Sequence, residues 1–297
     1  SSDLPDAEFP VINGEKGQFS LLLNVPAGNG GQAQLKSFQS GLRFNMVPRE
    51  AVAEITVPDK EQVTSEFGQF IENNPVTGKV EETMDGLKLT VIGKAAHGME
   101  PEKGINAGTY LASFLDKYDF AGGAASFISF LAKYLHLDTR MEKFDCSFTD
   151  DVMGELTMNA GILNYDEENG GQINMNFRYP KGITPDEIQA KVEKITKSLA
   201  ITVNQGDGQL PHYVDPDDPI VKTLMEAYID ISGDQNAKPE VVGGGTYGRL
   251  MKRGVAFGAL MPNTPNTMHQ ANEFQPVNDL ITSMAIYMQA INNLVTD

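Results

Sequence analysis

The stretch Gln205-Gly206-Asp207-Gly208-Gln209 marks a change in the organisation of the chain. It is polar, rich in glycine and followed by Pro211, which is typical of a linker. Before it, strand and helix patterns follow one another as in an α+β domain. After it, helices at about 218–231 and 277–295 are interspersed with short strands, as in α/β layers. The sequence therefore predicts a domain boundary at this stretch.

Two similar groups of strands and helices are expected before the linker. Alternating apolar residues predict strands, and apolar residues at helical spacing predict helices. The first group has expected strands at 18–24, 39–47 and 52–57, a helix to about residue 73, a hairpin at 79–83 and 86–93, and helices at about 104–118 and 123–136. The second group has expected strands at 155–164 and 171–179, a helix at about 185–199 and a strand at 200–204. Two β–α–β–β-like halves are therefore predicted.

The part after the linker ends in a helix with a long apolar face. Short strands are expected at 239–242 and 255–259, with the glycine-rich run Gly243-Gly244-Gly245-Thr246 between them. In the last helix, apolar residues recur at helical spacing: Val277, Leu280, Ile281, Met284, Met288, Ile291 and Val295. This pattern predicts a helix that packs its apolar face on a sheet.

Composition excludes some classes of partner. Of the 297 residues, 40% are hydrophobic, and no run approaches the ~20 apolar residues of a membrane span. The net charge of −17 argues against nucleic acid, whose phosphates need clustered Lys and Arg. The single cysteine, Cys146, cannot form an internal disulfide, which fits a reducing compartment. We expect a cytoplasmic protein with no nucleic-acid partner and no membrane partner.

The four histidines differ in their sequence surroundings. His136 lies at the end of an expected helix, where a packed or capping role is expected, and His212 has no assigned role. His97 and His269 are flanked by Gly, Pro and Asn, as expected for loops that carry ligand-contacting side chains. The sequence has no H-E-x-x-H motif and no paired cysteines, so local spacing predicts no metal site.

Four stretches resemble the metallopeptidase superfamily of PepV-type dinuclear-zinc dipeptidases, carnosinases and succinyl-diaminopimelate desuccinylases. They are Pro5-Asp6-Ala7-Glu8-Phe9-Pro10 with Asn13-Gly14-Glu15-Lys16-Gly17, Gly93-Lys94-Ala95-Ala96-His97-Gly98, Gly243-Gly244-Gly245-Thr246-Tyr247-Gly248-Arg249, and the run from Met261 to Glu273. Each motif is moderately specific. All four in this order, along essentially the whole chain, are strongly specific, and the resemblance is strongest to the PepV-type dipeptidases.

The resemblance implies roles for individual residues. Asp6 matches a carboxylate ligand of one zinc ion, and His269 matches a histidine ligand of the other. His97 and Asn45 match lid residues that reach the substrate, His97 as the catalytic residue that stabilises the oxyanion. Arg178 matches a residue that binds the free carboxylate of a dipeptide. The backbone amides of Gly244, Gly245 and Thr246 are expected to add contacts to a substrate carboxylate.

The resemblance also implies an architecture and a reaction. We expect an α/β catalytic domain that is split in sequence into residues 1–14 and 210–297, with an inserted α+β lid of two halves at residues 15–209. The reaction would be the hydrolysis of an unblocked dipeptide with two zinc ions, and the parent enzyme would be a monomer.

The superfamily's bridging carboxylate, its pair of adjacent glutamates and its first histidine ligand would all precede Asp6. Ser1-Ser2-Asp3-Leu4-Pro5 resembles the middle of a loop. We therefore expect the C-terminal portion of a longer enzyme, unable to retain both zinc ions and inactive alone. Two alternatives stay open: another hydrolase of the superfamily, such as a desuccinylase or other N-acyl amino acid deacylase, and a non-catalytic dipeptide-binding protein.

Overall fold

The computed structural model describes residues 7–265, 267 and 272–296, which form two units. The eight-stranded unit consists of Gly17–Asp150 and Gly154–Gln209. The three-stranded unit consists of the residues up to Lys16, Asp151–Met153 and the residues from Leu210 onward. Both units contain helices and strands, so the fold is a mixed α and β fold.

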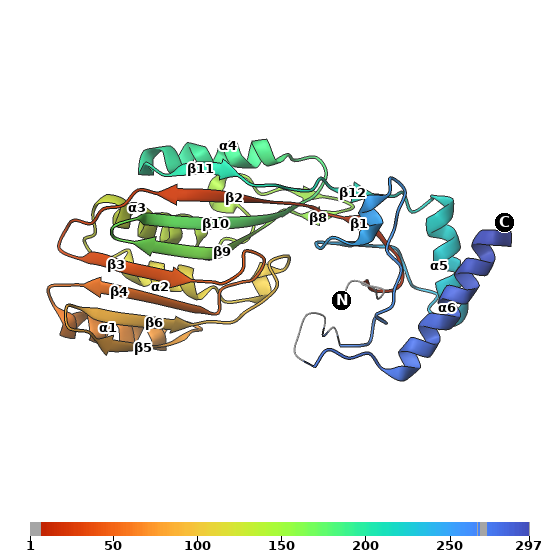
Figure 1. Cartoon of the computed structure of the whole chain (residues 1–297), viewed down its shortest axis with the longest axis horizontal. Helices are drawn as coiled ribbons and strands as arrows, with labels where there is room; N and C mark the ends of the chain where they lie inside the picture. The colour runs from red at the N-terminus through yellow and green to blue at the C-terminus, as the bar shows by residue number, and fades with distance from the viewer. Residues whose placement is uncertain (1–6, 266, 268–271, 297) are drawn as a thin grey trace. The chain divides into compact units, whose positions relative to one another are not determined.

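The eight-stranded unit is built on one antiparallel sheet with strand order β11-β2-β10-β9-β3-β4-β6-β5 (Figure 1). The strands are β2 (Gly17–Val25), β3 (Gln34–Ser40), β4 (Glu50–Thr56), β5 (Thr77–Glu82), β6 (Leu87–Ile92), β9 (Thr157–Asp166), β10 (Gly170–Tyr179) and β11 (Thr202–Gln205). A separate short hairpin joins β7 (Thr149–Asp150) to β8 (Gly154–Glu155). Strand β2 of the first expected group lies between β10 and β11 of the second, and β3 pairs with β9, so the two groups are interleaved in a single sheet.

One face of this sheet forms the hydrophobic core and the other face is polar. Buried and less buried positions alternate along β2, so Phe19, Leu21 and Leu23 point to one side. Four helices pack on that side: α1 (Lys60–Glu72), α2 (Ala107–Leu115), α3 (Gly122–Phe130) and α4 (Pro185–Thr196). A π-helical turn (Leu131–Leu135) and three 3₁₀ turns (Pro101–Lys103, Glu142–Phe144 and Lys197–Leu199) complete the unit.

Local signals explain where these helices begin. Asp59 caps α1 by accepting a hydrogen bond from the backbone N–H of Gln62 at 2.8 Å. Thr184 and Glu187 form a reciprocal capping box at the start of α4. The caps lie close to the helix starts expected from the sequence, so these two boundaries are confirmed.

The expected strand at 39–47 is wrong beyond Ser40, because residues 41–47 form a loop. Gly41 adopts a left-handed backbone conformation with φ of 84°, which ends the extended chain.

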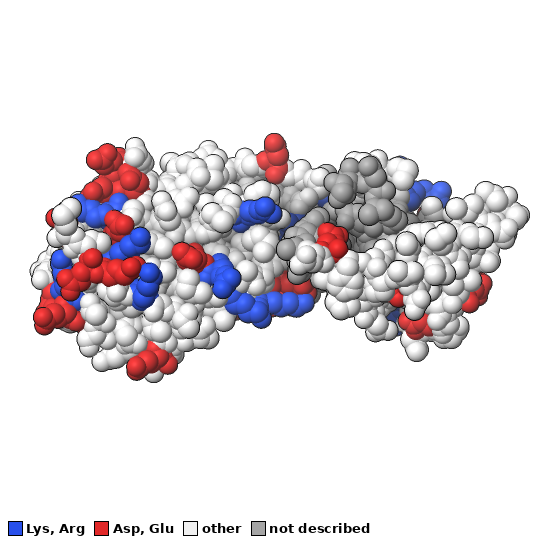
Figure 2. Space-filling model, turned by 60° about the horizontal axis from the view of Figure 1, so that its bottom comes forward, with Lys and Arg blue, Asp and Glu red and all other residues white. Residues whose placement is uncertain are grey.

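On the face drawn in Figure 2, the Lys and Arg side chains of the eight-stranded unit lie among Asp and Glu side chains rather than apart from them.

The three-stranded unit has strand order β12-β1-β13. Its strands are β1 (Ile12–Glu15), β12 (His212–Tyr213) and β13 (Glu240–Val242), with β1 and β13 parallel. Helices α5 (Pro219–Ser232) and α6 (Val277–Thr296) pack on each other, and a 3₁₀ turn spans Tyr247–Leu250. The expected strand at 255–259 is wrong: this segment pairs through isolated bridges, Ala256 with Ile12 and Leu260 with Glu8, and does not form a strand.

Helix α6 has the predicted bounds but packs through the opposite face. Ser283, Ile286 and Ala290 are its buried residues. The apolar side chains that were expected to pack on a sheet are exposed in this structure, including Ile281 at 60% and Met288 at 70%. The described part of the chain has no helix long and apolar enough to cross a membrane.

Candidate functional site

Two loops of the eight-stranded unit pair with each other and bring Asn45 next to His97. The backbone N–H of Gly98 donates to the carbonyl oxygen of Asn45 at 2.7 Å, and Val47 N–H donates to the Ala96 carbonyl at 2.9 Å. Met46 and His97 therefore form an antiparallel bridge. We call residues 44–47 and 96–98 the loop pair. The two residues that the resemblance assigns to substrate contact are neighbours in this structure.

The imidazole of His97 has a defined orientation within the loop pair. Its Nδ1 lies 3.1 Å from the backbone nitrogen of Met99, which donates to it. Because Nδ1 accepts this hydrogen bond, the neutral ring carries its proton on Nε2. The His97 side chain is half-buried. The hydrogen bond from Met99 therefore orients the Nε2–H donor of a partly desolvated side chain.

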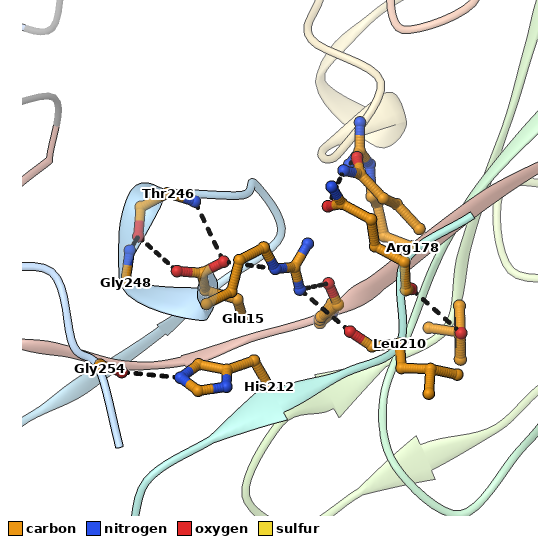
Figure 3. A network of polar contacts seen from close by, with 12 residues as sticks. Glu15, Arg178, Leu210, His212, Thr246, Gly248 and Gly254 are labelled. Atoms are coloured by element: carbon orange, nitrogen blue, oxygen red, sulfur yellow. Dashed lines mark hydrogen bonds and ion pairs between the residues drawn. The ribbon is translucent and has the colours of Figure 1, made fainter. Parts of the chain in front are cut away.

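Arg178 lies on β10 on the polar face of the sheet, and it is only 4% exposed. Its register neighbours are Gln18 on β2 and Thr157 on β9. One Nη1 hydrogen is donated to the side-chain oxygen of Gln18. One polar contact of this guanidinium is therefore with an uncharged amide of the neighbouring strand. Arg178 is one of the labelled side chains in Figure 3.

Asn159 connects the polar face to the loop pair. It stands opposite Asn176 in the β9–β10 register, two positions along from the Thr157–Arg178 pair, so its side chain points to the same face as Arg178. Its Nδ2 donates to the carbonyl oxygens of Phe44 at 2.9 Å and Met46 at 3.0 Å. The polar face that carries Arg178 thus also carries the side chain that binds the backbone on both sides of Asn45.

The glycine-rich run of the three-stranded unit binds a carboxylate of the protein itself. Glu15 is 1% exposed, and its two oxygens accept hydrogen bonds from the backbone N–H of Thr246 at 3.0 Å and from the Thr246 hydroxyl at 2.5 Å (Figure 3). The Nε of Arg249 lies 3.0 Å from the same carboxylate. The Thr246 amide, which was expected to contact substrate, therefore has the Glu15 carboxylate as its partner.

The other glycines of this run remain candidates. Gly244 is half-buried, and a Cβ added to it would meet no atom within 4 Å. Gly245 is exposed. Their predicted contacts with a substrate carboxylate stay predictions.

Sequence reasoning missed the roles of Glu15 and Asn159. Glu15 lies within one of the stretches that carry the family resemblance, yet a single glutamate there gives no sign of its partner. Asn159 is a polar residue within an otherwise apolar part of β9, and it is 1% exposed. A buried amide of this kind needs hydrogen-bond partners, which is the signal that could have identified it.

Both predicted metal ligands, Asp6 and His269, lie outside the described residues. In the ranges that the structure describes, no group of three or more His, Cys, Asp or Glu side chains is placed to hold a metal ion. The described side chains therefore do not by themselves form a set that fits zinc.

The remaining histidines have structural contacts. The ring of His136 packs edge-on against Tyr110, with 4.6 Å between centroids, and burial lowers its pKa to about 4, with the positive charge of Lys143 as a second cause. Its expected packed role is confirmed. The Nε2 of His212 donates to the Gly254 carbonyl at 2.7 Å.

The chain belongs to peptidase family M20/M25/M40, because the model of that family matches residues 15–293. Its relatives include proteins of Staphylococcus saprophyticus and Staphylococcus epidermidis, both named "Putative dipeptidase". Each is 39% identical over 99% of this chain, which spans 63% of the length of either relative. The structure of an aminoacylhistidine dipeptidase from Vibrio alginolyticus aligns with 96% of this chain, and the alignment covers 64% of the dipeptidase chain. The sequence identity is 15% and the TM-score is 0.45.

These comparisons confirm the expected superfamily and leave finer expectations open. They do not single out the PepV-type enzymes. The prediction that the chain is the C-terminal portion of a longer enzyme stays a prediction. Whether the chain alone is inactive is untested.

Proposed function

We propose that this protein acts in the hydrolysis of unblocked dipeptides and that the eight-stranded unit holds the substrate. One observation carries the proposal. The backbone pairing of the two loops places Asn45 beside an oriented His97, on the sheet face that also carries Arg178. The naming of relatives at 39% identity as dipeptidases supports the same substrate class.

His97 would donate a hydrogen bond from Nε2 to the oxygen of the scissile carbonyl. Negative charge develops on that oxygen as the carbonyl is attacked, so a donor that is already oriented stabilises the transition state more than the substrate. Removing one such donor typically costs a factor of 10² to 10³ in kcat, or about 3 kcal/mol. The Met99–Nδ1 hydrogen bond supplies the orientation, because it fixes the protonated nitrogen.

Arg178 would bind the free carboxylate of the dipeptide. The planar guanidinium can donate two parallel hydrogen bonds to a carboxylate, which is stronger and more directional than its present contact with the Gln18 amide. Substrate binding would then exchange a neutral acceptor for a charged one. Asn45 has an amide that can donate and accept, which suits a backbone amide of the substrate.

The proposal includes the finer architecture expected from the family resemblance. Residues 15–209 would form a lid inserted between two parts of a catalytic domain, residues 1–14 and 210–297. Two zinc ions would serve the reaction, with Asp6 and His269 among their ligands. Zinc retained after desalting, measured by elemental analysis, should fall in Asp6→Ala and His269→Ala relative to the unmodified chain. Equal zinc content in all three proteins would remove these two residues from the metal site.

The function is tested with a free dipeptide, the same dipeptide amidated at its C-terminus, and an N-acetyl amino acid, all in the presence of zinc. We expect binding and turnover to favour the free dipeptide. In Arg178→Lys, the preference of the protein for the free dipeptide over the amidated dipeptide should become smaller, because Lys cannot donate two parallel hydrogen bonds to a carboxylate. His97→Ala should lower kcat by 10² to 10³, whereas His136→Gln, a control far from the loop pair in sequence, should not. A preference for the N-acetyl amino acid, or neither binding nor turnover of any dipeptide, would refute the proposal.

A further inference from the structure

We infer that Asn159 is a positioning residue that fixes the geometry of the loop pair, and through it the direction of the His97 imidazole. Its Nδ2 has two hydrogens, and they are donated to the carbonyl oxygens of Phe44 and Met46. These carbonyls lie on either side of Asn45 in the chain. A single buried amide therefore holds the backbone on both sides of the predicted substrate residue.

The hydrogen bonds continue from Asn45 to the His97 loop. The Asn45 carbonyl accepts from Gly98 N–H at 2.7 Å, and Gly98 follows His97 directly. A displacement of residues 44–46 would therefore move the residue next to His97. The Met99 N–H that orients the imidazole is one residue further on.

Close packing leaves this arrangement little freedom. A Cβ at Gly98 would lie 2.9 Å from the Asn45 carbonyl oxygen and 3.2 Å from Asn159 Nδ2. A Cβ at Gly161, two residues after Asn159, would lie 2.3 Å from the Phe44 carbonyl oxygen. The loop therefore lies directly on the strand that carries Asn159, with glycine at both points of closest approach.

The chemistry of the contact requires an amide at position 159. Aspartate has nearly the same shape, but its carboxylate has no hydrogen to donate and would face two carbonyl oxygens. Alanine leaves both carbonyls without this partner. Only a side chain with two hydrogens on one nitrogen can bridge two carbonyls separated by a single residue in this way.

Hydrogen exchange tests the inference without any substrate. In Asn159→Ala and Asn159→Asp, the amides of Val47 and Gly98 should exchange at least ~10-fold faster, while amides of β3 and β4 keep their protection. Asn176→Ala is the matched control. Asn176 is 3% exposed and is the cross-strand neighbour of Asn159, but its Nδ2 donates to Phe19 and Ser20 within the sheet. This control should leave Val47 and Gly98 protected.

Unchanged protection of Val47 and Gly98 in the Asn159 variants, or equal loosening in Asn176→Ala, would overturn the inference. If the amides of the whole sheet lose protection in Asn159→Ala, the experiment is repeated with Asn159→Ser, whose hydroxyl keeps one hydrogen-bond donor. Faster exchange confined to the loop pair would then support the inference, and loss of protection across the whole sheet would count against it.

The consequence for His97 rests on the proposed function and is measured separately. In the Asn159 variants kcat for a free dipeptide should fall by at least ~10-fold, with less change in KM, because the displaced donor acts on the transition state. Wild-type kcat in a variant whose loop pair exchanges faster would overturn the positioning role. If the unmodified chain neither binds nor turns over dipeptides, the proposed function fails, while the exchange experiment still decides whether Asn159 fixes the loop pair.

Discussion

The buried contact between Glu15 and Arg249 provides a quantitative test of the three-stranded unit. The side chains of Glu15 and Arg249 are 1% and 9% exposed, and their closest charged atoms are 3.0 Å apart. Arg249→Met would leave a buried carboxylate without its counter-charge, which typically costs about 3–5 kcal/mol. Thr246 would still donate two hydrogen bonds to Glu15, so we expect a loss near the lower end, about 3 kcal/mol.

The assay is urea unfolding, monitored through the hydrogen exchange of amides in β1 and β13. These amides report the stability of the three-stranded unit separately from that of the rest of the chain. Lys222→Met is the control, because Lys222 pairs with Asp217 and their side chains are 56% and 86% exposed. An exposed pair of this kind is worth less than about 1 kcal/mol. The double variant Glu15→Gln with Arg249→Met should recover part of the loss, since no uncompensated charge remains buried. A loss below about 1 kcal/mol in Arg249→Met would refute the reasoning.

Two further predictions concern stability. The pKa of His136 is lowered to about 4 by burial, below the value of about 6.5 in an unfolded chain, so its contribution to stability is fully present above pH 6.5 and is lost as pH falls toward 4. This loss is at most about 3 kcal/mol, and His136→Gln should flatten the dependence of the urea midpoint on pH in that window; an unchanged pH profile would contradict the assignment. Ile286 is 0% exposed and Ile281 is 60% exposed on the same helix. Ile286→Ala should therefore cost about 2–5 kcal/mol and Ile281→Ala less than about 0.5, and equal losses measured by urea unfolding would mean that the exposed face of α6 is covered in solution.

Periodicity predicted the elements of the eight-stranded unit well because one face of its sheet is apolar and the other is polar. Alternation along β2 and β10 reports this difference directly, and the caps Asp59 and Thr184 mark where helices begin. Periodicity could not predict how α6 packs. A stripe of apolar residues shows that a helix has an apolar face, but not which neighbour covers it, and α5 contacts the side with Ile286 and Ala290 instead.

The loop at 41–47 shows a second limit of local patterns. Its residues Leu42, Phe44 and Met46 alternate as in a strand, and this favoured an extension of β3. The backbone of this segment instead hydrogen-bonds with the side chain of Asn159 and with the backbone of residues 96–98, which lie far away in sequence. Local alternation cannot reveal such partners, whereas the family resemblance had already selected Asn45 and His97 for a shared role.

The glycine-rich run from Gly243 to Arg249 shows that a motif can predict a chemistry without identifying its partner. Backbone amides at the start of a helical turn, followed by an arginine, favour a carboxylate, and the structure has a carboxylate bound there. It belongs to Glu15, 231 positions earlier in the chain than Thr246. The motif therefore joins β1 to the turn after β13 through a buried charge. A substrate carboxylate would have to displace Glu15 to use the Thr246 amide, and the displaced charge would then be buried without its partners. This cost counts against the Thr246 amide and favours Arg178, which the family resemblance selects, as the group that would bind a substrate carboxylate.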